Sequence, residues 1–199
     1  MKLLIGSNNK HKAEEFQQIF SQKLPGKIEL VMPRDVFNQN LIIVESGSTF
    51  RENALLKAKG FFEKSGLPCF SDDSGLEVRC LYGAPGINSA RYAGENATDE
   101  ENRKKVISKI INYPIHDRLA QFRAVICYYD GKEEFFAEGI CKGILIANER
   151  GKNGFGYDPI FIPEGYDITF AEMDPMQKNL LSHRRKAIDQ LIAHFEKIL

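Results

Sequence analysis

Hydrophobic and polar positions follow two different periods along this chain, and the changes of period mark the expected elements. A short apolar run in residues 2–7 ends in small polar residues, which is typical of a buried strand that enters a turn. Over residues 8–24 apolar side chains recur at helical spacing, and Asn8 or Asn9 can cap the helix start. The chain thus opens with strand, turn and helix, a unit that often places a ligand at a helix N-terminus.

The next elements repeat this mixture of strands and helices. Residues 28–33 and 40–46 predict two further strands. A helix follows, opened by a capping box of Thr49 and Glu52 and closed by Gly66. Residues 68–81 predict a strand, a tight turn and a second strand, because Asp, Ser and Gly are common in turns.

The second half of the chain contains the clearest hairpin signal. Residues 82–94 are rich in glycine and predict a loop, and a helix capped by Thr98 and Glu101 follows. Two strands around Asp130–Gly131 predict a hairpin in residues 120–146. A short strand at 160–162 precedes helical residues that begin at Asp174, restart at Ser182 and reach the C-terminus. Residues 1–199 are expected to form one mixed α/β domain.

Composition narrows the function classes. The chain has 199 residues, 43% of them hydrophobic, with 27 basic and 27 acidic side chains. A zero net charge argues against a non-specific binder of DNA or RNA, and no apolar run is long enough to span a membrane. The N-terminal apolar run is too short for a signal peptide. Four cysteines without a CxxC pair predict reduced core residues in a cytoplasmic protein rather than a zinc site.

Polar residues gather at the ends of the expected elements, where ligands bind in α/β proteins. The stretch from Ser7 to Lys12 offers hydroxyl and amide donors, a cation and free backbone N–H groups at a helix start, which suits a phosphate. The alternative is that its asparagines only cap the helix and that its lysines are solvated.

Acidic residues form a second group. Asp72 and Asp73 are adjacent, so their mutual repulsion calls for a cation. Glu45 follows an apolar run and precedes a helix that carries Lys57. Three carboxylates near one site would suit Mg²⁺, which prefers carboxylate and water oxygens and commonly bridges to phosphates; Lys57 or Lys12 would lie beside it. The alternative is an acidic turn.

The C-terminal third carries a possible base-binding group. Phe155 and Tyr157 are flat apolar rings between glycines, available for stacking on a base. His183 and Arg184 at a helix start can donate to ring carbonyls or phosphates. The alternative is a tight loop with a packed ring and a basic helix turn. The loop is neither a P-loop nor G-x-G-x-x-G. Together the groups describe a nucleoside triphosphate site without a P-loop.

The chain resembles the inosine triphosphate pyrophosphatase family, the Ham1-like non-canonical purine NTP pyrophosphatases, from Leu4 to about Leu191. The resemblance rests on Ser7, Asn9 and Lys12, which match the opening [ST]-x-N-x-x-K motif, and on five longer motifs in the family's order. These motifs are "ESGSTFRENALLKA", "DDSGLEV", "GAPGINSARYAG", "GFGYDPIF" and "SHRRKA". Ser7 replaces the family's more common Thr and keeps the hydroxyl, and Asn8 replaces a common Gly.

The resemblance implies an α/β fold with two lobes, a long, mixed, twisted central sheet flanked by helices, and an active-site cleft between the lobes. It also implies a homodimer and Mg²⁺-dependent hydrolysis of ITP, dITP and XTP to the nucleoside monophosphate and pyrophosphate. Such an enzyme cleanses the nucleotide pool. Carried over by motif, Asp73 is the catalytic residue, and Glu45 and Asp73 hold the metal. The expected substrate-binding residues are Ser7, Asn8, Asn9, Lys10, His11, Lys12, Lys57, Ser74, Phe155, Gly156, Tyr157, Asp158, Lys178, His183 and Arg184.

Residue chemistry suggests roles within this assignment. Asp73 would orient or deprotonate water, and Asp72 beside it would raise its proton affinity. Arg184, always a donor, would face the C6 carbonyl of hypoxanthine or xanthine, whereas the C6 amine of adenine would leave a donor unpaired. Two rivals stay open: a Maf-type enzyme for modified pyrimidine nucleotides, against which the C-terminal motifs argue, and a nucleotide sensor without turnover, which would need no Glu45–Asp73 pair.

Overall fold

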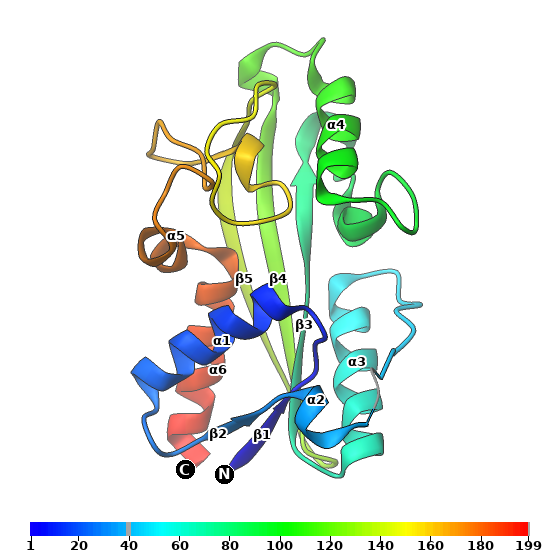
Figure 1. Cartoon of the computed structure of the whole chain (residues 1–199), viewed down its shortest axis with the longest axis vertical. Coiled ribbons are helices and arrows are strands. Elements are labelled where there is room, and N and C mark those ends of the chain that lie inside the picture. Colours follow the sequence, from blue (N-terminus) through cyan, green and yellow to red (C-terminus); the bar gives the residue numbers. More distant parts are fainter. Residues whose placement is uncertain (39–40, 199) are drawn as a thin grey trace. The chain divides into compact units, whose positions relative to one another are not determined.

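The computed structural model describes residues 1–38 and 41–198, and its strands form one mixed sheet (Figure 1). The sheet has six strands in the order β2-β1-β3-β4-β5-β6. Strand β1 pairs in parallel with β2 and β3, whereas β5 and β6 are antiparallel. This confirms the expected mixed α/β class. The strands are β1 (Lys2–Ile5), β2 (Glu29–Val31), β3 (Cys69–Val78), β4 (Leu119–Tyr129), β5 (Glu134–Leu145) and β6 (Phe161–Pro163).

The helices begin where the capping residues predict. The Asn9 side chain accepts from the Lys12 backbone N–H, and Thr98 and Glu101 form the full reciprocal capping box. Gly66 ends a helix with φ 69°, a left-handed conformation that favours glycine. The helices are α1 (Lys10–Lys23), α2 (Pro33–Val36), α3 (Phe50–Ser65), α4 (Asp99–Ile110), α5 (Pro175–Leu181) and α6 (His183–Ile198), with short 3₁₀ turns at 79–81, 86–91, 115–117 and 158–160.

The chain divides into two compact units, which agrees with the expectation of two lobes. The first unit comprises Met1–Asp73, Ala124–Gly139 and Arg184–Leu199. Within it, α1 and α6 cover one face of the strands and α3 covers the other (Figure 1). The alternation of strand side chains explains this layering, because Leu3 and Ile5 face α1 and α6 whereas Leu4 faces α3.

The second unit has its own core. It comprises Ser74–Arg123 and Ile140–His183. Leu76 and Val78 of β3 pack there with Val106 and Ile110 of α4 and with an aromatic group that includes Phe161. Each unit therefore buries apolar surface independently, and strands β3, β4 and β5 contribute residues to both.

Most expected elements are confirmed. Strands β4 and β5 flank the Asp130–Gly131 turn, in which the Asp130 carboxylate accepts from two backbone N–H groups. The C-terminal helical segment breaks at Ser182, as expected, and α6 buries Ala187, Leu191, Ile192 and Phe195. All four cysteines are free, and three of them are buried.

Two local predictions were wrong. The expected strand at 40–46 is absent from its described residues 41–46, which have no regular secondary structure; Asn40 lies outside the described residues. The expected turn at Asp72–Gly75 does not exist, because β3 runs without interruption from Cys69 to Val78. Composition favoured a turn, but both aspartates lie in a strand where basic partners compensate their charge.

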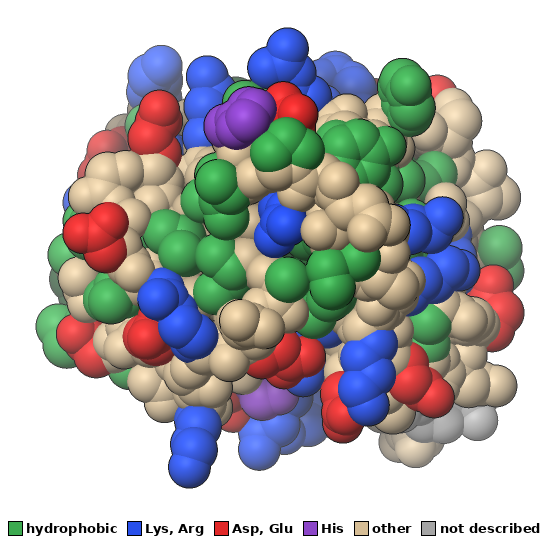
Figure 2. Space-filling model, turned by 90° about the horizontal axis from the view of Figure 1, so that it is seen from above, with side chains coloured by type: hydrophobic (Ala, Val, Ile, Leu, Met, Phe, Trp, Pro, Cys, Tyr) green, Lys and Arg blue, Asp and Glu red, His purple; other side chains and the backbone are tan. Residues whose placement is uncertain are grey.

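Charge is mixed over the surface. Basic and acidic side chains intermingle on the face shown in Figure 2, in keeping with the equal totals of 27. Among the described residues, no helix has the length and the hydropathy that crossing a bilayer requires.

Candidate active site

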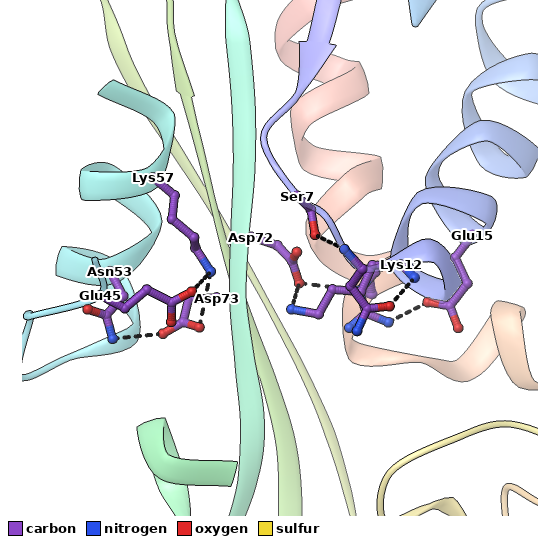
Figure 3. Close-up of polar contacts among 10 residues, drawn as sticks. Ser7, Lys12, Glu15, Glu45, Asn53, Lys57, Asp72 and Asp73 are labelled. Atoms are coloured by element: carbon purple, nitrogen blue, oxygen red, sulfur yellow. Dashed lines mark hydrogen bonds and ion pairs between the residues drawn. The ribbon is translucent and has the colours of Figure 1, made fainter. Parts of the chain in front are cut away.

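The two adjacent aspartates of β3 point to opposite faces of the strand (Figure 3). Successive side chains of a strand alternate between faces, so Asp72 and Asp73 meet different neighbours. Both are buried, with exposed fractions of 1% and 6%. The cation that compensates each aspartate is therefore different on the two faces of the strand.

Asp72 lies between two basic side chains of the first unit. Its Oδ2 is 3.0 Å from Lys12 Nζ and 3.4 Å from Arg184 Nε. Burial opposes ionisation, yet Lys12, Arg184 and the more distant Lys57 together hold the pKa of Asp72 well below its usual range. Arg184 also forms an ion pair with Glu15 of α1. Asp72 is thus a permanently ionised anchor for Lys12 and Arg184.

Asp73 faces α3 instead. Its Oδ1 is 3.4 Å from Lys57 Nζ, and its Oδ2 accepts from Asn53 Nδ2 at 3.1 Å. Glu45 Oε1 is 3.0 Å from the same ammonium group, so one cation serves two carboxylates. Burial raises the pKa of Asp73, Lys57 lowers it and Glu45 raises it again, with a net upward shift. The expected direction is confirmed, but burial and Glu45 cause it rather than Asp72.

The start of α1 arranges the phosphate-type donors. Asn9 is the N-cap, and its backbone N–H donates to Ser7 Oγ at 3.2 Å. Asn8 donates to the Leu41 carbonyl at 2.8 Å. Lys12 points to Asp72, whereas Lys10 and His11 are exposed beside Glu14 on the outer side of the helix. The structure therefore brings Lys12 into the aspartate cluster and leaves Lys10 and His11 outside it.

The idea that three carboxylates share one metal site was wrong, whereas the ligand pair Glu45 and Asp73 stays a prediction. Among the residues that the structure describes, no group of three or more His, Cys, Asp or Glu side chains is suitably placed for a metal ion. Asp72 lies on the other face of β3, so three carboxylates do not share one site. Glu45 and Asp73 do converge on one cation, Lys57 Nζ. Two carboxylates fit Mg²⁺, which commonly takes one or two carboxylates and completes its shell with water and substrate phosphates.

In the second unit, Asp158 organises the glycine-rich loop. Its Oδ2 accepts from the Phe155 backbone N–H at 2.8 Å and from Lys178 Nζ at 2.7 Å. The Lys178 ammonium lies 4.7 Å from the centre of the half-buried Phe155 ring. Gly156 is held from both sides, donating to Asp99 and accepting from Arg103. Phe155 is therefore presented on a loop fixed by buried charges.

Two residues predicted to contact substrate are core residues. Tyr157 is 4% exposed, its hydroxyl donates to the Ser89 carbonyl, and burial raises the pKa of its phenol. It is therefore not a free ring for stacking, and only Phe155 keeps that role. His183 is buried and stacked on Phe122, with ring centres 4.9 Å apart. Ser74 is half-buried in β3.

Sequence reasoning gave no role to Glu15 and did not include Asn53 among the site residues. The spacing of Asn53 and Lys57 predicts that they share one face of a helix, with a surface pair as the alternative, but it does not show that both contact Asp73. Glu15 lies three residues after Lys12 on α1, on the same helix side. No local pattern shows its partner, because Arg184 is 169 residues away in the chain.

Lysines held by carboxylates, beside a carboxylate whose pKa is raised, are typical of an enzyme that acts on an anionic substrate. The chain belongs to the Ham1 family, whose model matches residues 3–194. A dITP/XTP pyrophosphatase of Oceanobacillus iheyensis is 44% identical over 191 residues, covering 96% of this chain and 95% of the relative. A dITP/XTP pyrophosphatase of Porphyromonas gingivalis is 45% identical over 190 residues, covering 96% and 95%.

Solved structures agree with the family assignment. The Staphylococcus aureus Ham1 protein superimposes with a TM-score of 0.88 at 39% identity, covering all of both chains. A HAM1 protein from Coxiella burnetii gives a TM-score of 0.89 at 36% identity, covering 99% of both. These matches span nearly the whole chain, so they support the complete fold rather than one motif.

Proposed function

We propose that this enzyme hydrolyses the non-canonical purine nucleotides ITP, dITP and XTP to the nucleoside monophosphate and pyrophosphate with Mg²⁺, and thereby cleanses the nucleotide pool. The proposal is supported by relatives named dITP/XTP pyrophosphatase that match over nearly their full length. The observation that carries it is the Glu45–Lys57–Asp73 cluster, in which two carboxylates converge on one ammonium group.

Asp73 is assigned as the general base. Its raised pKa increases its proton affinity, and a base performs best when its pKa approaches the working pH. Asn53 fixes the carboxylate by donating to Oδ2. Asp73 would then orient the attacking water and accept its proton. When bound by Glu45 and Asp73, Mg²⁺ would supply charge neutralisation at the phosphates.

The phosphates are assigned to the basic residues of the first unit. Lys57 is buried and Lys12 is half-buried, and carboxylates hold both, so their positions are fixed before substrate binds. Ser7, Asn9 and the N-terminal N–H groups of α1 add neutral donors. Positioning and electrostatics account for most catalysis of phosphoryl transfer, so such preorganised donors suit the reaction.

The base is assigned to the loop of the second unit. Phe155 supplies the stacking ring, and Lys178 beside it replaces Arg184 as the donor to the C6 carbonyl. We revise the role of Arg184 because the residue is 2% exposed and its guanidinium donates to Asp72 and Glu15. A donor facing the C6 amine of adenine would stay unpaired, at a cost of about 1–3 kcal/mol.

The homodimer and the cytoplasmic location stay predictions from the family resemblance and the sequence, and so does the cleft between the lobes. A sensor without turnover is the second candidate. The Glu45–Asp73 pair favours an enzyme, because binding alone would not need a buried carboxylate of raised proton affinity.

The direct test is a pyrophosphate-release screen. Purified protein is offered ITP, dITP, XTP, the common nucleotides and modified pyrimidine nucleotides, each with and without Mg²⁺. We expect release from the first three alone and only with the metal. Release confined to pyrimidine nucleotides would favour the Maf-type rival, and binding of ITP without release would favour the sensor.

A further inference from the structure

The side chains of the segment that carries Glu45 alternate between two environments. Leu41, Ile43, Glu45 and Gly47 are half-buried, whereas the residues between them are exposed. Ile42 is 80% exposed and Val44 is 75% exposed. This period of two is the pattern of a strand with one face against the protein.

No strand is assigned in the described residues of this segment, 41–48, so another feature must set its register. At one end Asn8 donates to the Leu41 carbonyl at 2.8 Å. At the other end the Gly47 N–H donates to Asn53 Oδ1 at 2.8 Å. Both contacts fix the ends, and Glu45 lies between them.

Ile43 supplies a contact nearer to Glu45. It packs against Gly60 of α3, and a Cβ added to Gly60 would lie 2.7 Å from Ile43 Cδ1 and 3.1 Å from both Cγ atoms. Alanine ordinarily stabilises the interior of a helix relative to glycine, so a glycine here is explained by the space that Ile43 occupies. Gly47 is equally close to α3, because its added Cβ would lie 2.6 Å from Glu52 Cβ.

We infer that the Ile43–Gly60 contact is a positioning device that sets the register of residues 41–47 and so points Glu45 at Lys57. A shift of one residue exchanges the two faces of an extended segment. Val44 or Ser46 would then face Lys57, and the Glu45 carboxylate would face solvent. Ile43 and Gly60 touch no substrate in this account, so they act through Glu45 only.

The inference rests on the proposed function where it concerns the metal, and its test includes a readout that does not. Three variants are compared with the wild type: Gly60→Ala, Gly60→Ala with Ile43→Val, and Ile43→Ala. The matched control is Ile42→Ala, which removes the same side chain from the outward face of the same segment. Each protein is assayed for Mn²⁺ binding by electron paramagnetic resonance, for the Mg²⁺ concentration that half-saturates pyrophosphate release, and for urea unfolding.

We expect Gly60→Ala and Ile43→Ala to weaken metal binding by about 10-fold or more, the usual effect of losing support for a ligand. Ile42→Ala should match the wild type. Ile43→Val removes the atom nearest to the new methyl group, so the double variant should recover metal affinity. A purely structural role would lower the urea midpoint in both isoleucine variants according to burial and leave the metal requirement unchanged, which would overturn the inference.

The metal-free readout is the ¹H–¹⁵N signal of the Lys57 ammonium group, which reports its ion pairs without metal or nucleotide. We expect this signal to move in Gly60→Ala and Ile43→Ala and to stay in place in Ile42→Ala. An unchanged signal in both would overturn the inference, even if the enzyme is active. If the signal moves in these two variants while the wild-type protein releases no pyrophosphate, the result counts against the proposed function alone.

Discussion

The two faces of β3 carry the same side chain at adjacent positions and give it opposite properties. On one face Asp72 contacts Lys12 and Arg184, and these cations outweigh burial. On the other face Asp73 shares a single ammonium group with Glu45, and burial prevails. The number of cations around each carboxylate, rather than how deeply it is buried, decides whether the aspartate is an ionised anchor or a base.

This difference assigns separate tasks to the two aspartates. A carboxylate whose pKa is strongly lowered cannot accept a proton near neutral pH, so Asp72 holds Lys12 and Arg184 in place. A carboxylate whose pKa is raised can accept one, so Asp73 is the reactive group. One strand can position both because alternate side chains point to opposite faces.

The largest expected effect comes from Asp73→Asn. The amide keeps the shape but cannot accept a proton, so kcat should fall by about 10²–10⁴-fold. Nucleotide affinity should stay close to that of the wild type, as measured by calorimetry with dITP. Retention of more than about a tenth of the wild-type kcat would remove Asp73 from the role of base.

Asp72→Asn should instead remove the ion pairs on the other face of β3. It leaves the buried Arg184 and the half-buried Lys12 without their shared carboxylate, and breaking a buried ion pair typically costs about 3–5 kcal/mol of unfolding free energy. Urea denaturation measures the loss, with Asp73→Asn as the matched control. Equal stability of the two variants would show that Asp72 is not an anchor.

Phe155→Ala sharpens the comparison because it changes neither aspartate of β3 and none of the ion-pair partners described for them. Base–aromatic stacking is worth about 1–3 kcal/mol, so the dissociation constant for dITP should rise accordingly while the pH dependence of kcat stays unchanged. Equilibrium binding and pH profiles test both halves. Unchanged affinity would mean that Phe155 only packs beneath Lys178.

The smallest effect concerns the proton affinity of Asp73 in the metal-free protein. Glu45 raises the pKa of Asp73, so Glu45→Gln should move the titration of the Asp73 carboxyl group to lower pH. Carbon-13 NMR titrations of the two metal-free proteins measure this shift, and a titration that moves to higher pH would contradict the assignment.

The stability contributions of the two aspartates have opposite signs with pH. Asp72 has a lowered folded pKa, so its contribution is present above the unfolded pKa and is lost as pH falls. Asp73 has a raised folded pKa, so its contribution is fully present below the unfolded pKa and is lost as pH rises through the folded value.

Local signals predicted much of this fold. Caps at Asn9, Thr49 and Thr98 and the turn at Asp130–Gly131 act within a few residues, so the sequence shows them directly. The turn expected at Asp72 was wrong because distant basic residues make a strand tolerable there. The burial of the Tyr157 ring was not foreseen because its partner Ser89 is 68 residues away. Motifs in the sequence could name the expected site residues. Which of these residues contact one another depends on segments far apart in the chain, so the sequence did not show it.

The central claim is that Asp72 and Asp73 differ in proton affinity, and a carbon-13 NMR titration of their carboxyl groups tests it in one sample. Asp73→Asn supplies the assignment of the Asp73 signal. The account predicts that Asp73 titrates above the ordinary range of aspartate, while Asp72 stays ionised until the protein unfolds in acid. If Asp72 takes up the proton first, or if both titrate together at an ordinary pKa, the assignment of anchor and base is contradicted.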